Sequence, residues 1–276
     1  MGAMGITGAA GASDAGARNV GWSGGGAHGS GGTGGVGGLG GTGGGRGGST
    51  RRGGRLWDPF GTLHGALWIG GGQWAGKSTV AQILAYRYGL TAYHYDYHDA
   101  RAHEDRRIAR DVRLGRPTPE VRDPDETWVK PPPEEMAART LVAFPERFTW
   151  ALDDLRALVS GRPVLAEGWG LRPELVAPLL SSPRRMVVMV PTEEFRARQV
   201  RRLPRARKVH QRVSDPERAQ ANRLERDRLV AQDAVLKAEE LGIMVIRVDG
   251  SLNAAQVADV VASQFRPFLT FDGQSF

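Results

Sequence analysis

The stretch Gly71-Gly72-Gln73-Trp74-Ala75-Gly76-Lys77-Ser78 decides the fold class of this chain. It fits the pattern G-x-x-x-x-G-K-S/T, and Thr79 follows it. In such a loop, consecutive backbone N–H groups and the first turn of the next helix point at one place and hold phosphate groups there. Lys77 would bridge the outer phosphates, and the Ser78 hydroxyl would complete a Mg²⁺ shell.

The sequence on either side of this loop has the expected context. The apolar run 66–69 precedes the glycines, and Val80, Ile83, Leu84 and Tyr88 then recur at helical spacing. This order predicts a strand, a glycine-rich loop and a helix. A chance match to the pattern would lack this arrangement.

Four further short apolar runs predict more strands, at 91–95, 163–166, 186–190 and 243–248. Helical patterns follow them. Because strands buried on both faces read as unbroken apolar runs, five such runs separated by helices favour an open parallel sheet covered on both sides.

Helix boundaries are marked by capping residues. Thr192, followed by two glutamates, is a typical N-cap. The segment 214–217 should begin a long helix that ends near Leu241, with Gly242 as its C-terminal stop, and Ser251 should open the last helix.

The segment 97–162 is irregular, and we call it the acceptor-side insertion. It is rich in charge and proline, and we expect separate helical pieces on either side of Pro145. An insertion between the second and third strands lies over the carboxyl edge of the sheet, where ligands bind in open α/β folds.

With these residues the chain resembles the P-loop kinases, in particular their nucleoside monophosphate kinase-like and shikimate kinase-like branch. The resemblance spans roughly 67–268 and is carried by the loop above, by 191–202 and by 245–251. It implies a three-layer α/β/α fold of the P-loop NTPase type with a five-stranded parallel sheet of order 2-3-1-4-5. It also implies ATP as donor, Mg²⁺ as cofactor and an arginine-rich lid at 193–215.

Acidic residues at strand ends are the next candidates. In these kinases an acid at the place of Asp96 orients or deprotonates the acceptor hydroxyl, or holds a magnesium-bound water, and Asp99 could assist it. The alternative for Asp96 is a solvated turn residue. Glu167 resembles a Walker B acid, and its alternative is a capping or loop carboxylate. His94 and His98 flank Asp96, but nothing identifies a third ligand for a zinc site.

Ten Lys and Arg residues lie between 184 and 212. Such a run is usually a solvated face. The alternative is a closing lid, and Arg198 and Arg202, four residues apart, would then grip the transferring phosphoryl group from one helix face. Arg223 and Arg226 on the following helix are similar to the family's second pair of lid arginines.

Trp74 departs from the family pattern, because many P-loops of kinases have a glycine there. A bulky side chain at this place could narrow the loop or cap the nucleotide. The alternative is that its ring packs on the outer side of the loop.

Composition separates a tail from the rest of the chain. The sequence holds 39 glycines in 276 residues and no cysteine. Most of the glycines lie in 1–54, so we expect 1–55 to be a disordered tail and 56–276 to be the kinase-like domain. The absence of cysteine and of a long apolar run predicts a cytoplasmic protein with no membrane partner. Most of the net charge of +7 comes from arginines of the tail, which makes nucleic acid an unlikely partner.

These features together favour an ATP-dependent phosphotransferase that acts on a hydroxyl or phosphate of a small molecule. Two alternatives remain open at this point. One is a nucleotide-binding regulatory or interaction protein without turnover. The other is a polynucleotide kinase that receives nucleic-acid ends on the basic 184–212 segment. The combination of Asp96, Glu167 and the lid arginines favours the first reading, because a protein that only binds nucleotide needs no acid on the acceptor side.

Deletion of residues 1–54 should leave the melting temperature and the nucleotide affinity unchanged. The segment contains little apolar surface to bury, so its removal costs the folded state almost nothing. Calorimetry of the full and shortened chains would check this. A loss of several degrees would mean that the segment packs against the domain.

Overall fold

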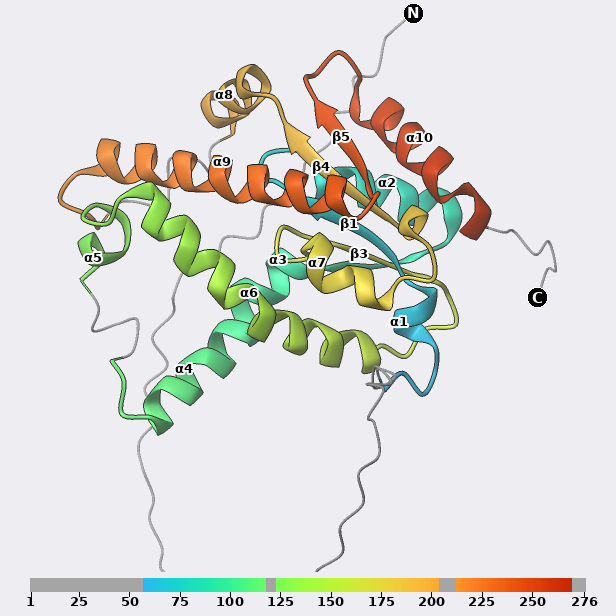
Figure 1. Ribbon diagram of the computed structural model, residues 1–276, viewed down its shortest axis with the longest axis horizontal. Helices are drawn as coiled ribbons and strands as arrows, with labels where there is room; N and C mark the ends of the chain where they lie inside the picture. The colour runs from blue at the N-terminus through green and yellow to red at the C-terminus, as the bar shows by residue number, and fades with distance from the viewer. Residues whose placement is uncertain (1–56, 118–122, 204–211, 270–276) are drawn as a thin grey trace, which may run out of the picture. The chain divides into compact units, whose positions relative to one another are not determined.

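The computed structural model describes residues 57–117, 123–203 and 212–269 (Figure 1). Residues Gly54–Phe276 form one compact unit. The expected tail, 1–55, lies outside the described residues, and so does the part 204–211 of the expected lid.

A five-stranded parallel sheet forms the centre of this unit, with strand order β2-β3-β1-β4-β5. Both the strand directions and the order are those that the resemblance implied. The strands are β1 (Leu67–Gly71), β2 (Thr91–His94), β3 (Val164–Glu167), β4 (Met186–Pro191) and β5 (Met244–Val248).

Helices cover both faces of the sheet (Figure 1). Trp68 of β1 belongs to the core that packs under α6 and α9, whereas its neighbours Leu67 and Ile69 belong to the core under α2 and α10. This alternation follows from the pleat of a strand, which points successive side chains to opposite faces. The predicted three-layer α/β/α architecture is therefore confirmed. The four helices are α2 (Lys77–Tyr88), α6 (Pro133–Arg156), α9 (Pro216–Glu240) and α10 (Ala254–Phe265).

Shorter elements complete the described part of the chain. They are α1 (Thr62–Gly65), α3 (Tyr95–His98), a π-helical turn (Asp99–His103), α4 (Glu104–Arg113), α5 (Asp125–Trp128), α7 (Pro173–Val176) and α8 (Glu193–Arg202), with 3₁₀ turns at Ala177–Leu179, Pro183–Arg185 and Arg266–Phe268. None of the helices in the described ranges is both long and apolar enough to cross a membrane.

The segment from the end of β2 to the end of α6 differs from its prediction in two places. Strand β2 ends at His94, so Asp96 lies in the first turn of the short helix α3 and not at a strand end. One continuous helix, α6, runs through Pro145 where two helical pieces were expected. The helix continues because residues on both sides of the proline, among them Phe144, Phe148 and Leu152, are buried against the domain core. This packing offsets the backbone hydrogen bond that proline cannot donate.

Most of the predicted helix ends are confirmed. The Thr192 side chain accepts a hydrogen bond from the N–H of Phe195 at 3.3 Å, and Asp215 caps α9 in the same way. Gly242 follows α9 with a φ of 65°, in the left-handed region that glycine favours. The start of the last helix was predicted wrongly: its N-cap is Asn253, which forms a capping box with Gln256, and not Ser251.

Replacing Pro145 by alanine should stabilise the protein. Pro145 is exposed and lies inside α6, where proline is less favourable than alanine by up to about 3 kcal/mol. We expect a gain of roughly 1–3 kcal/mol in the free energy of unfolding, measured by urea denaturation. A loss of stability would show that the domain core requires a bend that proline provides.

Candidate nucleotide and acceptor site

The glycine-rich loop runs from the end of β1 to the start of α2. Gly71 has a φ of 111°, and a Cβ there would lie 2.2 Å from the carbonyl oxygen of Met189 on β4. Only glycine allows this approach, which brings the loop close to the neighbouring strand. The N–H of Gly72 then donates to the same carbonyl at 2.9 Å, and this bond fixes the first turn of the loop.

Lys77 and Ser78 lie in the first turn of α2, as the motif predicts. Lys77 is only 5% exposed, and its Nζ donates to the carbonyl oxygen of Gly72 at 2.8 Å, across the mouth of the loop. Ser78 and Thr79 are exposed. The N-terminus of α2, the ammonium group and the exposed hydroxyls therefore offer positive charge and donors in one place.

Trp74 connects the loop to α9. Its side chain is buried, and its indole Nε1–H donates to Asp227 of α9 at 3.3 Å. The guanidinium group of Arg223 lies over the ring, 5.4 Å from its centre. The ring is therefore packed against α9.

Asp96 lies next to the loop. Its carboxylate accepts hydrogen bonds from Gln73 of the loop at 3.4 Å and from the backbone N–H of Trp169 at 2.9 Å. Burial raises the pKa of Asp96 to about 6. The charges of Glu167 and Asp99 act in the same direction, and that of Lys77 opposes them. Asp96 is therefore mainly ionised at neutral pH but holds a proton far more readily than an exposed aspartate.

Glu167 is the last residue of β3 and is 1% exposed. Its Oε1 is 2.7 Å from Nδ1 of His94 on β2. This hydrogen bond raises the pKa of His94 above its ordinary value. The other oxygen, Oε2, is buried and has no hydrogen-bond partner among the described residues. A buried acceptor without a donor is costly, and a metal-bound water would satisfy it.

The segment after β3 is packed tightly against α3. A Cβ at Gly168 would lie 2.5 Å from Cβ of Tyr95, and one at Gly170 would lie 2.2 Å from the ring of the same tyrosine. The lack of space beside Tyr95 therefore excludes a side chain at either glycine. This close packing puts the N–H of Trp169 within reach of Asp96.

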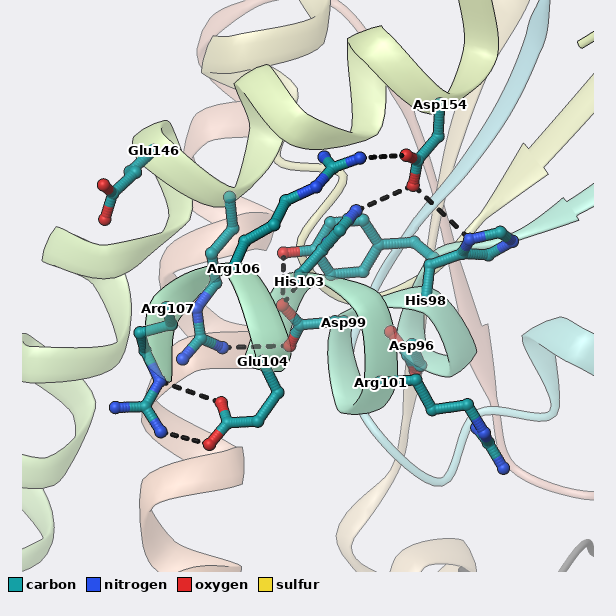
Figure 2. Close-up of polar contacts among 12 residues, drawn as sticks. Asp96, His98, Asp99, Arg101, His103, Glu104, Arg106, Arg107, Glu146 and Asp154 are labelled. Carbon is teal, nitrogen blue, oxygen red and sulfur yellow. Dashed lines mark hydrogen bonds and ion pairs between the residues drawn. The ribbon is translucent and has the colours of Figure 1, made fainter. Parts of the chain in front are cut away.

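Asp154 of α6 holds the start of the acceptor-side insertion in place (Figure 2). Its carboxylate accepts from Nε2 of His103 at 2.8 Å and from Arg106 at 3.2 Å, and it lies 3.4 Å from Nδ1 of His98. The hydroxyl of Tyr93 also donates to it, at 3.0 Å. The turns that follow Asp96 are thus attached to the long helix α6.

Asp99 is less available than expected. It accepts a hydrogen bond from Arg147 of α6 at 2.9 Å, so it takes part in the attachment of the insertion. His94 and His98 have separate carboxylate partners, Glu167 and Asp154. No group of three or more His, Asp or Glu side chains that could hold a metal ion is present in the described ranges.

The predicted lid arginines do not converge on the loop. Arg198 donates to the backbone oxygen of Asp249, after β5, and its guanidinium group lies over Phe195. Arg202 is exposed at the end of α8, directly before the segment 204–211 that is not described. Arg226, by contrast, is held beside the loop by its ion pair with Asp227, the residue that Trp74 contacts.

Several residues of the site were missed in the sequence. Trp169 could have been found, since it follows a predicted parallel strand at the edge where ligands bind. Nothing in the sequence marks Asp227, Asp154 or Arg147 as part of the site. Each lies within a helix and contacts its partner only through the tertiary fold.

The residues present fit a magnesium nucleotide. The loop N–H groups and Lys77 would hold the phosphates, and the Ser78 hydroxyl would bind the ion directly. The unsatisfied Glu167 Oε2, with Asp96 nearby, would accept from water on that ion. When bound, Mg²⁺ would neutralise charge on the phosphate groups of the nucleotide.

Comparisons with known proteins give a distant likeness in structure only. No protein-family model matches the chain, and no curated protein matches it. Among solved structures, shikimate kinase from Acinetobacter baumannii in complex with shikimate aligns with 76% of this chain and 95% of its own. The identity is 17% and the TM-score 0.37.

The carboxyl group of Asp96 should titrate with a midpoint near 6. It should be protonated below that pH and ionised above it. Carbon-13 NMR of labelled aspartate, assigned with the variant Asp96→Asn, would measure this. Glu167→Gln removes a neighbouring negative charge and should lower the midpoint. A midpoint at the ordinary value of about 4 would show that the carboxylate is solvated.

Proposed function

We propose that this protein is an ATP-dependent phosphotransferase, which moves the γ-phosphoryl group of ATP to a hydroxyl or phosphate oxygen of a small molecule. The observation that carries the proposal is the contact between the two halves of the site. Gln73 of the phosphate loop donates to Asp96, the acid directly before the acceptor-side insertion. A donor loop and an acceptor-side acid within one hydrogen bond of each other are what in-line transfer requires.

In this mechanism each residue has a defined task. The loop N–H groups and Lys77 hold the β- and γ-phosphates. Asp96 orients the acceptor and takes the proton of its hydroxyl as the new bond from oxygen to the γ-phosphorus forms. The bond from the γ-phosphorus to the bridging oxygen breaks, and ADP leaves. With a pKa of about 6, Asp96 is ionised at neutral pH and ready to accept that proton.

Incubation with labelled ATP and a metabolite extract tests the proposal directly. Label transferred to a small molecule, identified by mass, would support it and name the acceptor. Asp96→Asn should abolish most of this transfer with little change in ATP affinity, since the amide keeps the shape but cannot take the proton. Transfer by this variant within threefold of wild type would remove Asp96 from the mechanism.

Lys77→Ala should weaken ATP binding and lower transfer by roughly 10²-fold or more, because it removes the charge that stabilises the outer phosphates. The buried sheet does not depend on this side chain, so the fold should persist. ATP affinity and turnover, measured with a circular dichroism control, would check both points. An affinity within twofold of wild type would mean that the loop does not hold phosphates.

A further inference from the structure

Trp74 occupies a backbone conformation that bulky residues rarely adopt. Its φ is 70°, and among the described residues it alone combines a positive φ with a side chain. Such a conformation persists only when the surroundings hold it. The contacts of the indole ring therefore help to set the shape of the phosphate loop.

Those contacts come from α9, at a site far away in the sequence. The indole N–H donates to Oδ2 of Asp227, which is 3% exposed. The other oxygen of Asp227 accepts from Nε of Arg226 at 3.0 Å and from its Nη2 at 2.5 Å. Asp227 thus joins the tryptophan of the loop to one particular guanidinium group.

Arg226 in turn joins two aromatic rings. Its guanidinium carbon lies 5.2 Å from the ring centre of Trp128 and 5.3 Å from that of Trp169. Trp128 belongs to α5 of the acceptor-side insertion, and the N–H of Trp169 donates to Asp96. A planar guanidinium group stacks well on aromatic faces, and burial strengthens the contact.

A second set of contacts docks α5 on α9. The side-chain amide of Asn222 donates to the carbonyl oxygens of Trp128, Val129 and Pro131 at 3.1, 3.1 and 3.3 Å. The backbone N–H of Ser214 donates to Asp125 at 2.9 Å. Docking of α5 therefore fixes the ring of Trp128 against Arg226.

We propose that Trp74 is a positioning residue that couples nucleotide binding at the loop to docking of the acceptor-side insertion, through Asp227, Arg226 and Trp128. The inference rests on the proposed function, since it assumes that the loop binds ATP. When α5 is docked, Arg226 is stacked, Asp227 is fixed and Trp74 holds the loop in its phosphate-binding shape. Because such coupling is reciprocal, a ligand that docks α5 strengthens ATP binding, and ATP favours docking.

The affinity for ATP·Mg²⁺ of the full chain, measured by isothermal titration calorimetry, tests this coupling. Trp74→Phe keeps an aromatic ring, though a smaller one, and loses the N–H, and it should weaken binding about tenfold. Trp128→Ala should weaken it about fivefold or more, because Trp128 lies in α5, which packs on α9, and its ring is the far end of the chain of contacts. The double variant should bind ATP·Mg²⁺ at most about twofold less tightly than whichever single variant binds it less tightly. The reason is that both changes break the same chain of contacts.

Trp150→Ala is the matched control. Trp150 is also a partly buried tryptophan of the acceptor-side insertion, but its ring contacts His103. The substitution Trp150→Ala should leave the ATP affinity within twofold of wild type even if it lowers the melting temperature. An equal loss of affinity for Trp150→Ala and Trp128→Ala would show a general effect of stability and overturn the proposal.

Asn222→Ala provides a second, independent way to loosen α5, which matters if Trp128→Ala does not fold. It should weaken ATP binding in the same direction. Affinities within twofold of wild type for both Trp128→Ala and Asn222→Ala, or losses that simply multiply in the double variant, would refute the coupling. Wild-type protein that binds no ATP would instead refute the proposed function, so the two failures are distinguishable.

Discussion

The register of three neighbouring strands is the constraint on which the candidate site depends. Ile69 of β1, Glu167 of β3 and His94 of β2 form one row across the sheet. Since the strands are parallel, the segments that follow them lie at the same edge of the sheet. These segments carry the phosphate loop after β1, Trp169 after β3 and Asp96 after β2. A slip of β2 by one residue would turn its side chains to the opposite face and separate His94 from Glu167.

Most features that were predictable from the sequence are encoded by residues close together in the chain. The phosphate loop is a motif of adjacent residues, and the caps at Thr192 and Asp215 act within one helical turn. The five strands could be read because burial on both faces leaves unbroken apolar runs. The position of Asp96 near the loop followed from topology, although the strand before it is shorter than expected.

The features that were not predictable depend on contacts between distant segments. Trp74 and Asp227 are 153 residues apart in the chain, and His103 and Asp154 are 51 apart. Local reasoning breaks α6 at Pro145, because the burial that sustains the helix comes from other elements. In the same way, spacing alone placed Arg198 and Arg202 on one helix face, but could not reveal that Asp249 engages Arg198.

The close packing of Tyr95 against Gly168 and Gly170 has a consequence for how this site can change in evolution. The space that side chains at the two glycines would need is filled by one tyrosine. At Gly170 a larger residue is tolerated only after the ring of Tyr95 has become smaller, and a smaller residue at 95 alone leaves a cavity in the core. At Gly168 the nearest atom is Cβ of Tyr95 and φ is 153°, so glycine is required there whatever ring stands at 95. A change of shape at this place therefore passes through paired substitutions whose order matters, so positions 95 and 170 should vary together or not at all.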